Sequence, residues 1–214
     1  MNELLLDEKF DTSTFDSRLQ WFNIPQKWGI KDSGLVIEPD AQTDYWQRTH
    51  YGFQVDNGHF LYAEVSGDFI ATTRVRFSPV HQYDQAGLMV RISPACWLKT
   101  SVEYEPEEPN RLGVVVTNGG YSDWSTQSFP KACTDLMLRV RREDSDYLVD
   151  YAVNDLPDQE ESTPSWTQIR MAHLHEDDGH IAVQCGLYAC SPTESGYSAE
   201  FDFLTITPGR ILSH

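Results

Sequence analysis

Apolar and polar side chains alternate with a period of two over many short stretches of this chain. Such a period is typical of strands that have one buried face and one solvated face. Within residues 201–207, the alternation predicts one face with Phe201 and Phe203 and an opposite face with Leu204 and Ile206. Comparable stretches lie at residues 35–37, 69–77, 136–141 and 147–153.

Turn-forming residues separate these stretches, as in Asn118-Gly119-Gly120. We count about twelve to fourteen candidate strands and no amphipathic helix, although Met1–Phe10 and Pro39–Tyr45 could each hold a short helical turn. Many short strands without intervening helices predict an all-β sandwich, and this length favours a jelly roll of two antiparallel sheets. We therefore expect one domain over residues 1–214, with the acidic segment Asp155–Ser165 as an excursion between two strands.

Composition narrows the choice of partner. The 214 residues include 33 acidic and 16 basic side chains, for a net charge of −17. Such a charge disfavours binding to nucleic acid or to an anionic membrane surface, and it favours a neutral or cationic partner. The chain has no apolar run of about 20 residues, which a membrane span needs.

The compartment is predicted from the start of the chain and from the cysteines. The first ten residues carry acids beside three leucines and lack the basic region and cleavage site of a signal peptide. We therefore expect a cytoplasmic protein with reduced and mostly buried thiols. The four thiols belong to Cys96, Cys133, Cys185 and Cys190.

Several separate segments, in order, resemble those of one known family. They are residues 44–50 (DYWQRTH), 83–91 (YDQAGLMVR), 97–99 (WLK), 103–104 (EY), 112–118 (LGVVVTN) and 122–125 (SDWS). This set resembles the DUF1349 family, also called the "regulation of enolase" family. The resemblance implies the fold of the concanavalin A-like lectin/glucanase superfamily, which is a jelly-roll sandwich of two curved antiparallel sheets. It implies no reaction, and the family's second name suggests a regulatory module that binds a metabolic enzyme.

Three of these segments combine a polar and aromatic face with a more apolar one. If their strands are neighbours, the polar faces form a groove on the concave sheet, and a loop that carries Trp124 closes one end of it. Aromatic rings stack on the apolar faces of sugars while fixed polar groups bond their hydroxyls, so we expect a carbohydrate or similar polyhydroxyl ligand. The candidate ligand-binding residues are Trp46, Arg48, His50, Gln85, Arg91, Trp97, Lys99, Glu103 and Trp124.

Other functions remain open for the same residues. Glu103 could be the acid or base of a glycoside hydrolase, with Glu105 or Asp44 as the second carboxylate that such chemistry requires. Neighbouring cations are expected to lower the pKa of Glu103. The charged groups could equally form a structural ion-pair network, and the tryptophans could simply pack in a core.

Metal binding is the last candidate chemistry. His173 and His175 share one face of a strand and precede acidic residues, a pattern that an ordinary acidic turn also produces. Asp144-x-Asp146 and Asp177-Asp178-Gly179 could hold a structural calcium ion, although neither has the spacing of an EF-hand loop. We therefore expect no cofactor, with a structural calcium ion as the alternative. The sequence does not indicate an oligomeric state.

Overall fold

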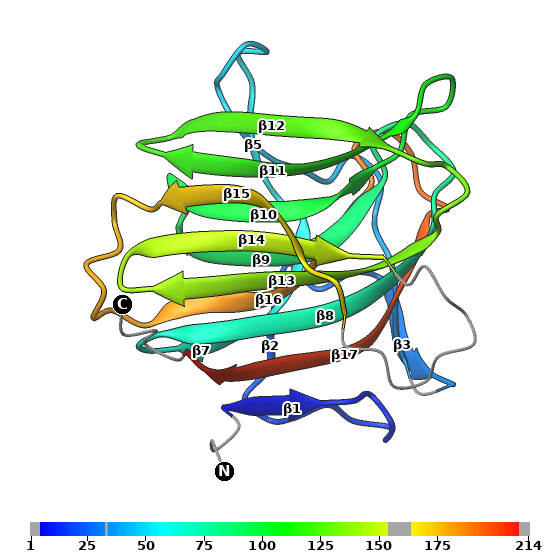
Figure 1. Ribbon diagram of the computed structural model, residues 1–214. Coiled ribbons are helices and arrows are strands. Elements are labelled where there is room, and N and C mark those ends of the chain that lie inside the picture. The colour runs from blue at the N-terminus through cyan, green and yellow to red at the C-terminus, as the bar shows by residue number, and fades with distance from the viewer. Residues whose placement is uncertain (1–4, 33, 154–163, 210–214) are drawn as a thin grey trace.

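Two antiparallel sheets face each other in the computed structural model, which describes residues 5–32, 34–153 and 164–209 (Figure 1). The eight-stranded sheet runs in the order β15 (Thr167–His173), β14 (Asp146–Ala152), β13 (Asp135–Glu143), β8 (Phe69–Ser78), β17 (Ser198–Pro208), β4 (Gly34–Glu38) and β3 (Lys27–Lys31), with β1 (Leu6–Glu8) also on β17. The seven-stranded sheet runs in the order β12 (Tyr121–Phe129), β11 (Asn110–Asn118), β10 (Cys96–Glu103), β9 (Gln85–Ser93), β16 (Val183–Cys190), β7 (His59–Val65) and β2 (Gln20–Phe22). A separate hairpin consists of β5 (Tyr45–Gln47) and β6 (Gln54–Asp56). This arrangement confirms the predicted all-β sandwich.

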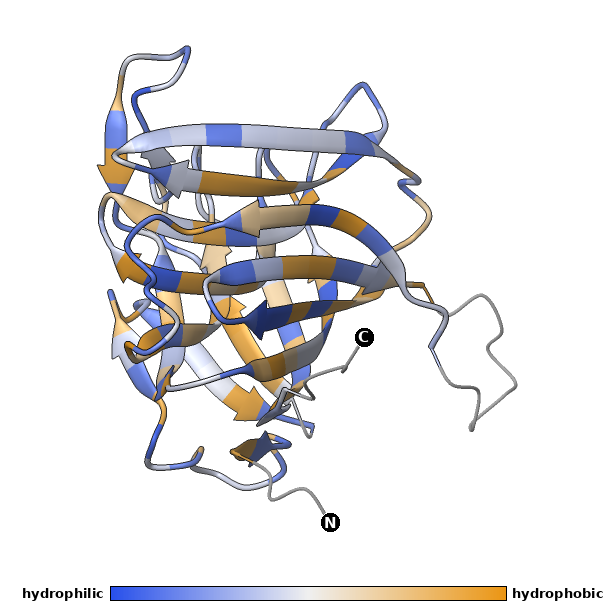
Figure 2. Cartoon of the chain, turned by 60° about the vertical axis from the view of Figure 1, so that its left-hand side comes forward, coloured by the Kyte–Doolittle hydropathy of each residue, from blue (hydrophilic) through white to orange (hydrophobic). Residues whose placement is uncertain are grey.

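The main core lies between the two sheets. Alternation along the strands places one apolar row of side chains towards the other sheet. Figure 2 shows the alternation itself as orange and blue bands along the strands. Leu88 and Val90 of β9, for example, are fully buried in the same cluster as Leu138 and Val140 of β13. The burial of these rows is the main stabilising contribution to the fold.

The pattern in β17 departs from simple alternation. The register with β8 shifts between Phe201 and Phe203, so Phe201, Leu204 and Ile206 are buried while Phe203 is only partly buried. The predicted face with both phenylalanines is therefore wrong. A β-bulge places one extra residue in the strand and reverses the faces that follow it.

Both predicted helical turns are also wrong over the described residues. Leu6–Glu8 forms β1, which pairs with β17, and residues 39–44 contain no helical turn. The described ranges contain 17 strands, which are 15 in the two sheets and two in the hairpin. This is more than we expected, because four of the strands have only three residues. The acidic segment 155–165 lies mostly outside the described residues. No helix in the described part of the chain is long and apolar enough to cross a membrane.

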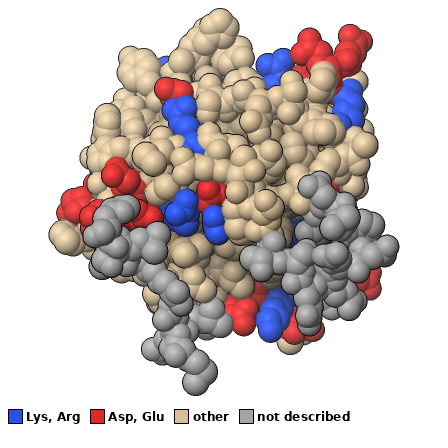
Figure 3. Space-filling model, in the orientation of Figure 1, with Lys and Arg blue, Asp and Glu red and all other residues tan. Residues whose placement is uncertain are grey.

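Charged side chains on the outer face of the eight-stranded sheet are paired. Arg74 and Arg76 lie 2.7 and 2.8 Å from the carboxylates of Asp135 and Asp202, respectively. In Figure 3, blue and red atoms accordingly appear next to one another in small groups on a largely uncharged face. The electrostatic field over this face therefore does not have a single sign.

Candidate functional site

The outer face of the seven-stranded sheet carries the candidate residues of β9 and β10. These two strands pair directly, and the register sets Trp97 opposite Arg91 and Glu103 opposite Gln85. Lys99 projects from the same face, because it lies two residues from Trp97 and four from Glu103. The two strand segments therefore lie side by side, as the groove hypothesis requires.

The β5–β6 hairpin covers part of this face and creates a second apolar cluster. Trp97 is fully buried there, and its ring lies 6.0 Å from that of Tyr45. Close packing depends on Gly58, because a Cβ atom at this position would come within 2.3 Å of the Tyr45 ring and 2.5 Å of the Cys190 sulfur. The cluster comprises Tyr45, Trp46, Phe60, Tyr62, Met89, Trp97, Val115, Tyr188 and Cys190.

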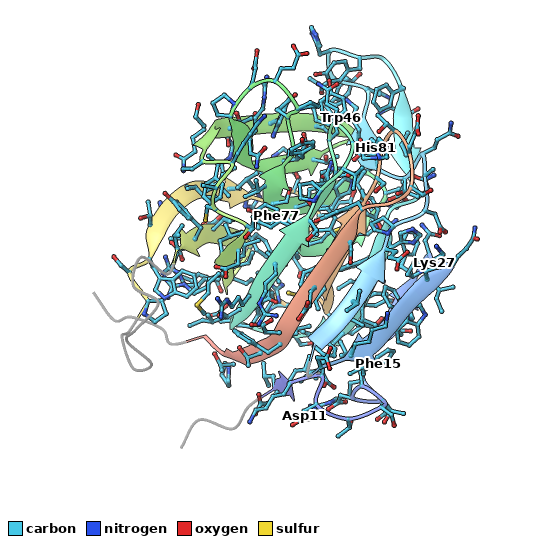
Figure 4. All side chains as sticks on the ribbon, turned by 90° about the vertical axis from the view of Figure 1, so that its right-hand side faces the viewer. Asp11, Phe15, Lys27, Trp46, Phe77 and His81 are labelled. Atoms are coloured by element: carbon cyan, nitrogen blue, oxygen red, sulfur yellow. The ribbon has the colours of Figure 1, made fainter. Side chains whose placement is uncertain are left out.

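Polar contacts hold the base of the hairpin on the sheet. Arg91 donates to the Asp56 carboxylate at 2.7 Å and lies over the Phe22 ring at 4.4 Å. The backbone N–H of Gln47 donates to the Ser122 hydroxyl at 2.9 Å. Figure 4 shows Trp46, on β5, at the opposite end of the view from Asp11. The hairpin thus forms a fixed wall at this end.

A cavity of about 370 Å³ remains beside the hairpin. Its walls are largely aromatic, and its polar groups come from β9, β10 and the residue that precedes β5. The lining residues are Asp44, Trp46, Tyr51, Phe53, Tyr83, Gln85, Lys99, Glu103, Val115, Trp124, Pro192 and Thr193. Tyr51 and Trp124 also line two neighbouring depressions of about 420 and 570 Å³, so the cavity opens into a longer groove.

Glu103 is the acidic group of this cavity with the most unusual environment. Its carboxylate accepts a hydrogen bond from Gln85 at 3.4 Å, and the Gln85 oxygen in turn accepts one from Tyr188 at 3.2 Å. Burial raises the pKa of Glu103 to about 8, against a lowering influence of Lys99 and a further raising influence of Asp44. The expectation that neighbouring cations lower this pKa is therefore wrong, because loss of water outweighs them.

Lys99 forms an ion pair at the edge of the cavity. Its Nζ lies 2.8 Å from Asp44 Oδ1, and its side chain is only 3% exposed. Burial lowers the pKa of Lys99, but the Asp44, Cys190 and Glu103 charges outweigh that effect and raise it overall. Lys99 therefore remains a cation, and the Asp44 carboxylate balances it.

Glu105, a candidate second carboxylate, lies outside this cavity in the depression of about 420 Å³. Its carboxylate lies 3.0 Å from Arg111 Nε and accepts a hydrogen bond from Gln82 at 2.8 Å. These two contacts occupy both of its oxygens. Its environment is that of a structural ion pair.

Five of the nine candidate ligand-binding residues line the cavity, namely Trp46, Gln85, Lys99, Glu103 and Trp124. Trp97 and Arg91 do not, because the hairpin covers both. Arg48 and His50 have positive φ angles of 55° and 63°, which end the alternation of β5. His50 lies at the depression of about 570 Å³, and Arg48 donates to the Gly120 carbonyl at 3.2 Å.

The sequence analysis missed the remaining aromatic walls. Tyr51 and Phe53 lie on the tip of the hairpin, and Tyr83 precedes β9. The two aromatic side chains so close together at Tyr51 and Phe53, beside Gly52, were the available signal, since exposed aromatic groups gathered on a turn usually have a packing or binding reason. Pro192 and Thr193 gave no such signal.

The candidate metal-binding residues lie outside the cavity. His173 pairs with Asp146 at 3.1 Å, and its ring lies 5.5 Å from that of His175. The Asp177 carboxylate accepts hydrogen bonds from Arg142 and Tyr147, so its oxygens are already occupied. Within the described ranges, no group of three or more histidine, cysteine and acidic side chains is arranged to hold a metal ion.

Comparison with known proteins identifies relatives over most of the chain. Residues 21–209 match the model of a family described as "Protein of unknown function (DUF1349)". The chain is 33% identical over 187 residues to "Regulation of enolase protein 1" of Saccharomyces cerevisiae, a match that covers 87% of this chain and 88% of that protein.

Solved structures show the same fold. A functionally unknown protein from Saccharomyces cerevisiae superposes with a TM-score of 0.79 and 32% identity, over 91% of this chain and 98% of that one. A xylan beta-1,4-xylosidase from Bacillus halodurans C-125 superposes with a TM-score of 0.74 and 12% identity, over 94% of this chain but 38% of the enzyme. At that identity the second likeness concerns the fold alone.

Proposed function

Because this chain belongs to the DUF1349 family and has the jelly-roll fold of its relatives, we propose that it works as a binding protein for a polyhydroxyl ligand. The ligand would occupy the cavity beside the β5–β6 hairpin. The observation that carries this proposal is the combination of aromatic walls with a buried polar floor in one open cavity.

The composition of the cavity suits a sugar ring. Trp124, which is partly buried, and the exposed Tyr51 and Phe53 supply flat apolar surfaces on which the C–H faces of a pyranose can stack. Gln85 and Glu103 supply fixed hydrogen-bonding groups for the hydroxyls. A volume of about 370 Å³ falls within the usual range for small-molecule sites and accommodates one or two sugar units.

Binding without hydrolysis fits the carboxylates better than catalysis does. A glycoside hydrolase normally needs two free carboxyl groups on opposite sides of the scissile bond. Glu103 could serve as the acid, since its raised pKa keeps it protonated at neutral pH. The partner groups are engaged, because Asp44 is paired with Lys99 and Glu105 with Arg111.

A protein partner is the second candidate function, and the rim of the groove favours it. Tyr51, Phe53, Tyr83 and Tyr121 are 56%, 45%, 39% and 61% exposed, respectively. Exposed aromatic side chains gathered on one surface are typical of protein interfaces. The printed name of the yeast relative, "Regulation of enolase protein 1", points in the same direction.

A glycan array followed by calorimetric titration of its best sugar tests the proposal. Trp124→Ala should weaken binding at least tenfold, because Trp124 is only partly buried and lines every part of the groove. Trp28→Ala is the matched control, since Trp28 is 39% exposed and lines no part of the groove. Absence of any sugar binding at millimolar concentration would overturn the proposal and leave the protein-partner function.

A further inference from the structure

The balance of charge inside the cavity is uneven. Lys99 and Asp44 cancel one another through their 2.8 Å ion pair, which leaves Glu103 as the remaining ionisable acid on the floor. Glu107 and Glu108 line the adjoining depression of about 420 Å³, and both are exposed. Once Glu103 is ionised, the site as a whole is negative and is enclosed by aromatic rings.

We propose that the natural ligand carries a cationic amine, as an amino sugar does, and that its ammonium group contacts the carboxylate of Glu103 inside the aromatic wall. This inference rests on the proposed function, which it narrows to a charged class of sugar. Aromatic faces attract cations through their quadrupoles, and a carboxylate at the base of such a wall completes the usual recognition site for an ammonium group.

The contacts of Glu103 leave room for such a group. Among the described residues its carboxylate accepts one side-chain hydrogen bond, from Gln85 at the long distance of 3.4 Å. The two cations of the chain beside Glu103 are engaged elsewhere, because Lys99 directs its Nζ to Asp44 and Arg111 pairs with Glu105 and Glu108. A ligand ammonium group would therefore supply the charge-assisted hydrogen bond that Glu103 lacks.

Binding of a cation is coupled to loss of a proton. The charged groups around Glu103 are Lys99, Asp44, Glu105 and Arg111, and with burial they hold its pKa at about 8. At pH 6 the carboxyl O–H bond must break and its proton must pass to the buffer before the carboxylate can pair with an ammonium group. A neutral sugar requires no such step, so the two ligand classes differ in their pH dependence.

The test uses two sugars with the same ring, glucose and N,N,N-trimethylglucosamine, whose charge is permanent and does not titrate. Affinity for the trimethylated sugar should rise roughly 50-fold from pH 6 to pH 8, because the ionised fraction of Glu103 rises from roughly 1% to about half. Titration at pH 6 in two buffers of different ionisation enthalpy should show close to one proton released. Glucosamine at pH 7 provides a less bulky cation, which should bind at least tenfold more tightly than glucose.

Glu103→Gln separates charge from shape, because the amide has nearly the same size as the carboxyl. It should remove the pH dependence and weaken binding of the cationic sugars at least tenfold, while glucose affinity changes less than threefold. Equal affinity of glucose and glucosamine would overturn this inference and leave the proposed function intact. Failure of both cationic sugars to bind, while a neutral sugar from the array binds, would likewise overturn this inference alone. Failure of these three sugars and of every sugar on the array would overturn the proposed function, and this inference with it.

Discussion

Two ion pairs of this protein each join a buried cationic side chain to a carboxylate, but their surroundings differ. Arg142 and Asp177 have fully buried side chains, and the carboxylate receives two guanidinium N–H groups as well as the Tyr147 hydroxyl. Lys99 and Asp44 meet at a single 2.8 Å contact, and the Asp44 side chain is 19% exposed at the edge of a cavity. One pair is enclosed by the protein, and the other is open to a ligand.

The difference shows which pair serves the fold. Arg142 also donates to the carbonyls of Gly67 and Ile181 at 3.0 and 3.2 Å, and so ties two loops to the eight-stranded sheet. Every polar atom there has a partner, which is the condition under which a buried ion pair is tolerated. The Lys99 pair leaves the neighbouring Glu103 with few partners, and incomplete satisfaction of this kind is typical of binding sites.

The largest expected effect comes from breaking the enclosed pair. Arg142→Met leaves the Asp177 carboxylate buried without a cation and should lower the free energy of unfolding by about 3–5 kcal/mol. Arg76→Met, at a partly exposed pair, is the matched control and should cost less than about 1 kcal/mol. Urea titration measures both. Equal losses in the two variants would contradict the role of the enclosed pair.

Breaking the open pair should cost less stability and more function. In Lys99→Met, water can reach the partly exposed Asp44, so we expect a loss of about 2–3 kcal/mol. Binding of a neutral sugar should weaken, because Lys99 lines the cavity and its loss leaves the Asp44 carboxylate there without a partner. Lys27→Met, at an exposed pair 3.4 Å long, is the control for loss of a lysine. A loss in Lys99→Met as large as in Arg142→Met would remove the distinction between the two pairs.

The smallest expected effect concerns the pH dependence of stability. The pKa of Glu103 is about 8 in the folded chain against an ordinary value of 4.5, so between these values the folded state holds a proton that the unfolded state has lost. Stability contributed at this site is therefore greatest below pH 4.5 and declines as the pH rises towards 8.

Glu103→Gln should remove that decline and make the variant more stable than the original chain at pH 8. We expect a gain of roughly 1–3 kcal/mol in the free energy of unfolding, since one pKa unit corresponds to about 1.4 kcal/mol and water at the cavity screens part of the effect. Melting temperatures from pH 5 to pH 8.5 measure it. Glu38→Gln, at an exposed pair, should leave the profile unchanged. Parallel profiles for the original chain and Glu103→Gln would contradict the raised pKa.

Most of the sandwich could be predicted from alternation, because burial of one strand face leaves a direct record in the sequence. The exceptions have local causes. The bulge after Phe201 reverses the faces of β17, and no residue type marks it in advance. The predicted helical turn at 39–45 is instead a connection that crosses to Ser191 and enters the hairpin.

The site was only partly predictable, for a different reason. Alternation within β9 and β10 correctly brought Gln85, Lys99 and Glu103 to one face of the sheet. It could not indicate that a hairpin would cover Trp97 and leave Glu103 at a cavity, because that depends on contacts between distant segments. The direction of the Glu103 pKa shift depends on how far distant segments remove its carboxyl group from water, and so it also needed the structure.

The strands of the β5–β6 hairpin and the turn that joins them differ in how firmly they are held. Arg91 fixes its base through Asp56, and the N–H of Gln47 fixes the end of β5 on Ser122, whereas the turn beyond carries Tyr51 and Phe53 between residues with positive φ angles. Tyr51 and Phe53 are 56% and 45% exposed, so substitutions of these two side chains should alter the rim of the groove more than the packing of the sheet beneath it.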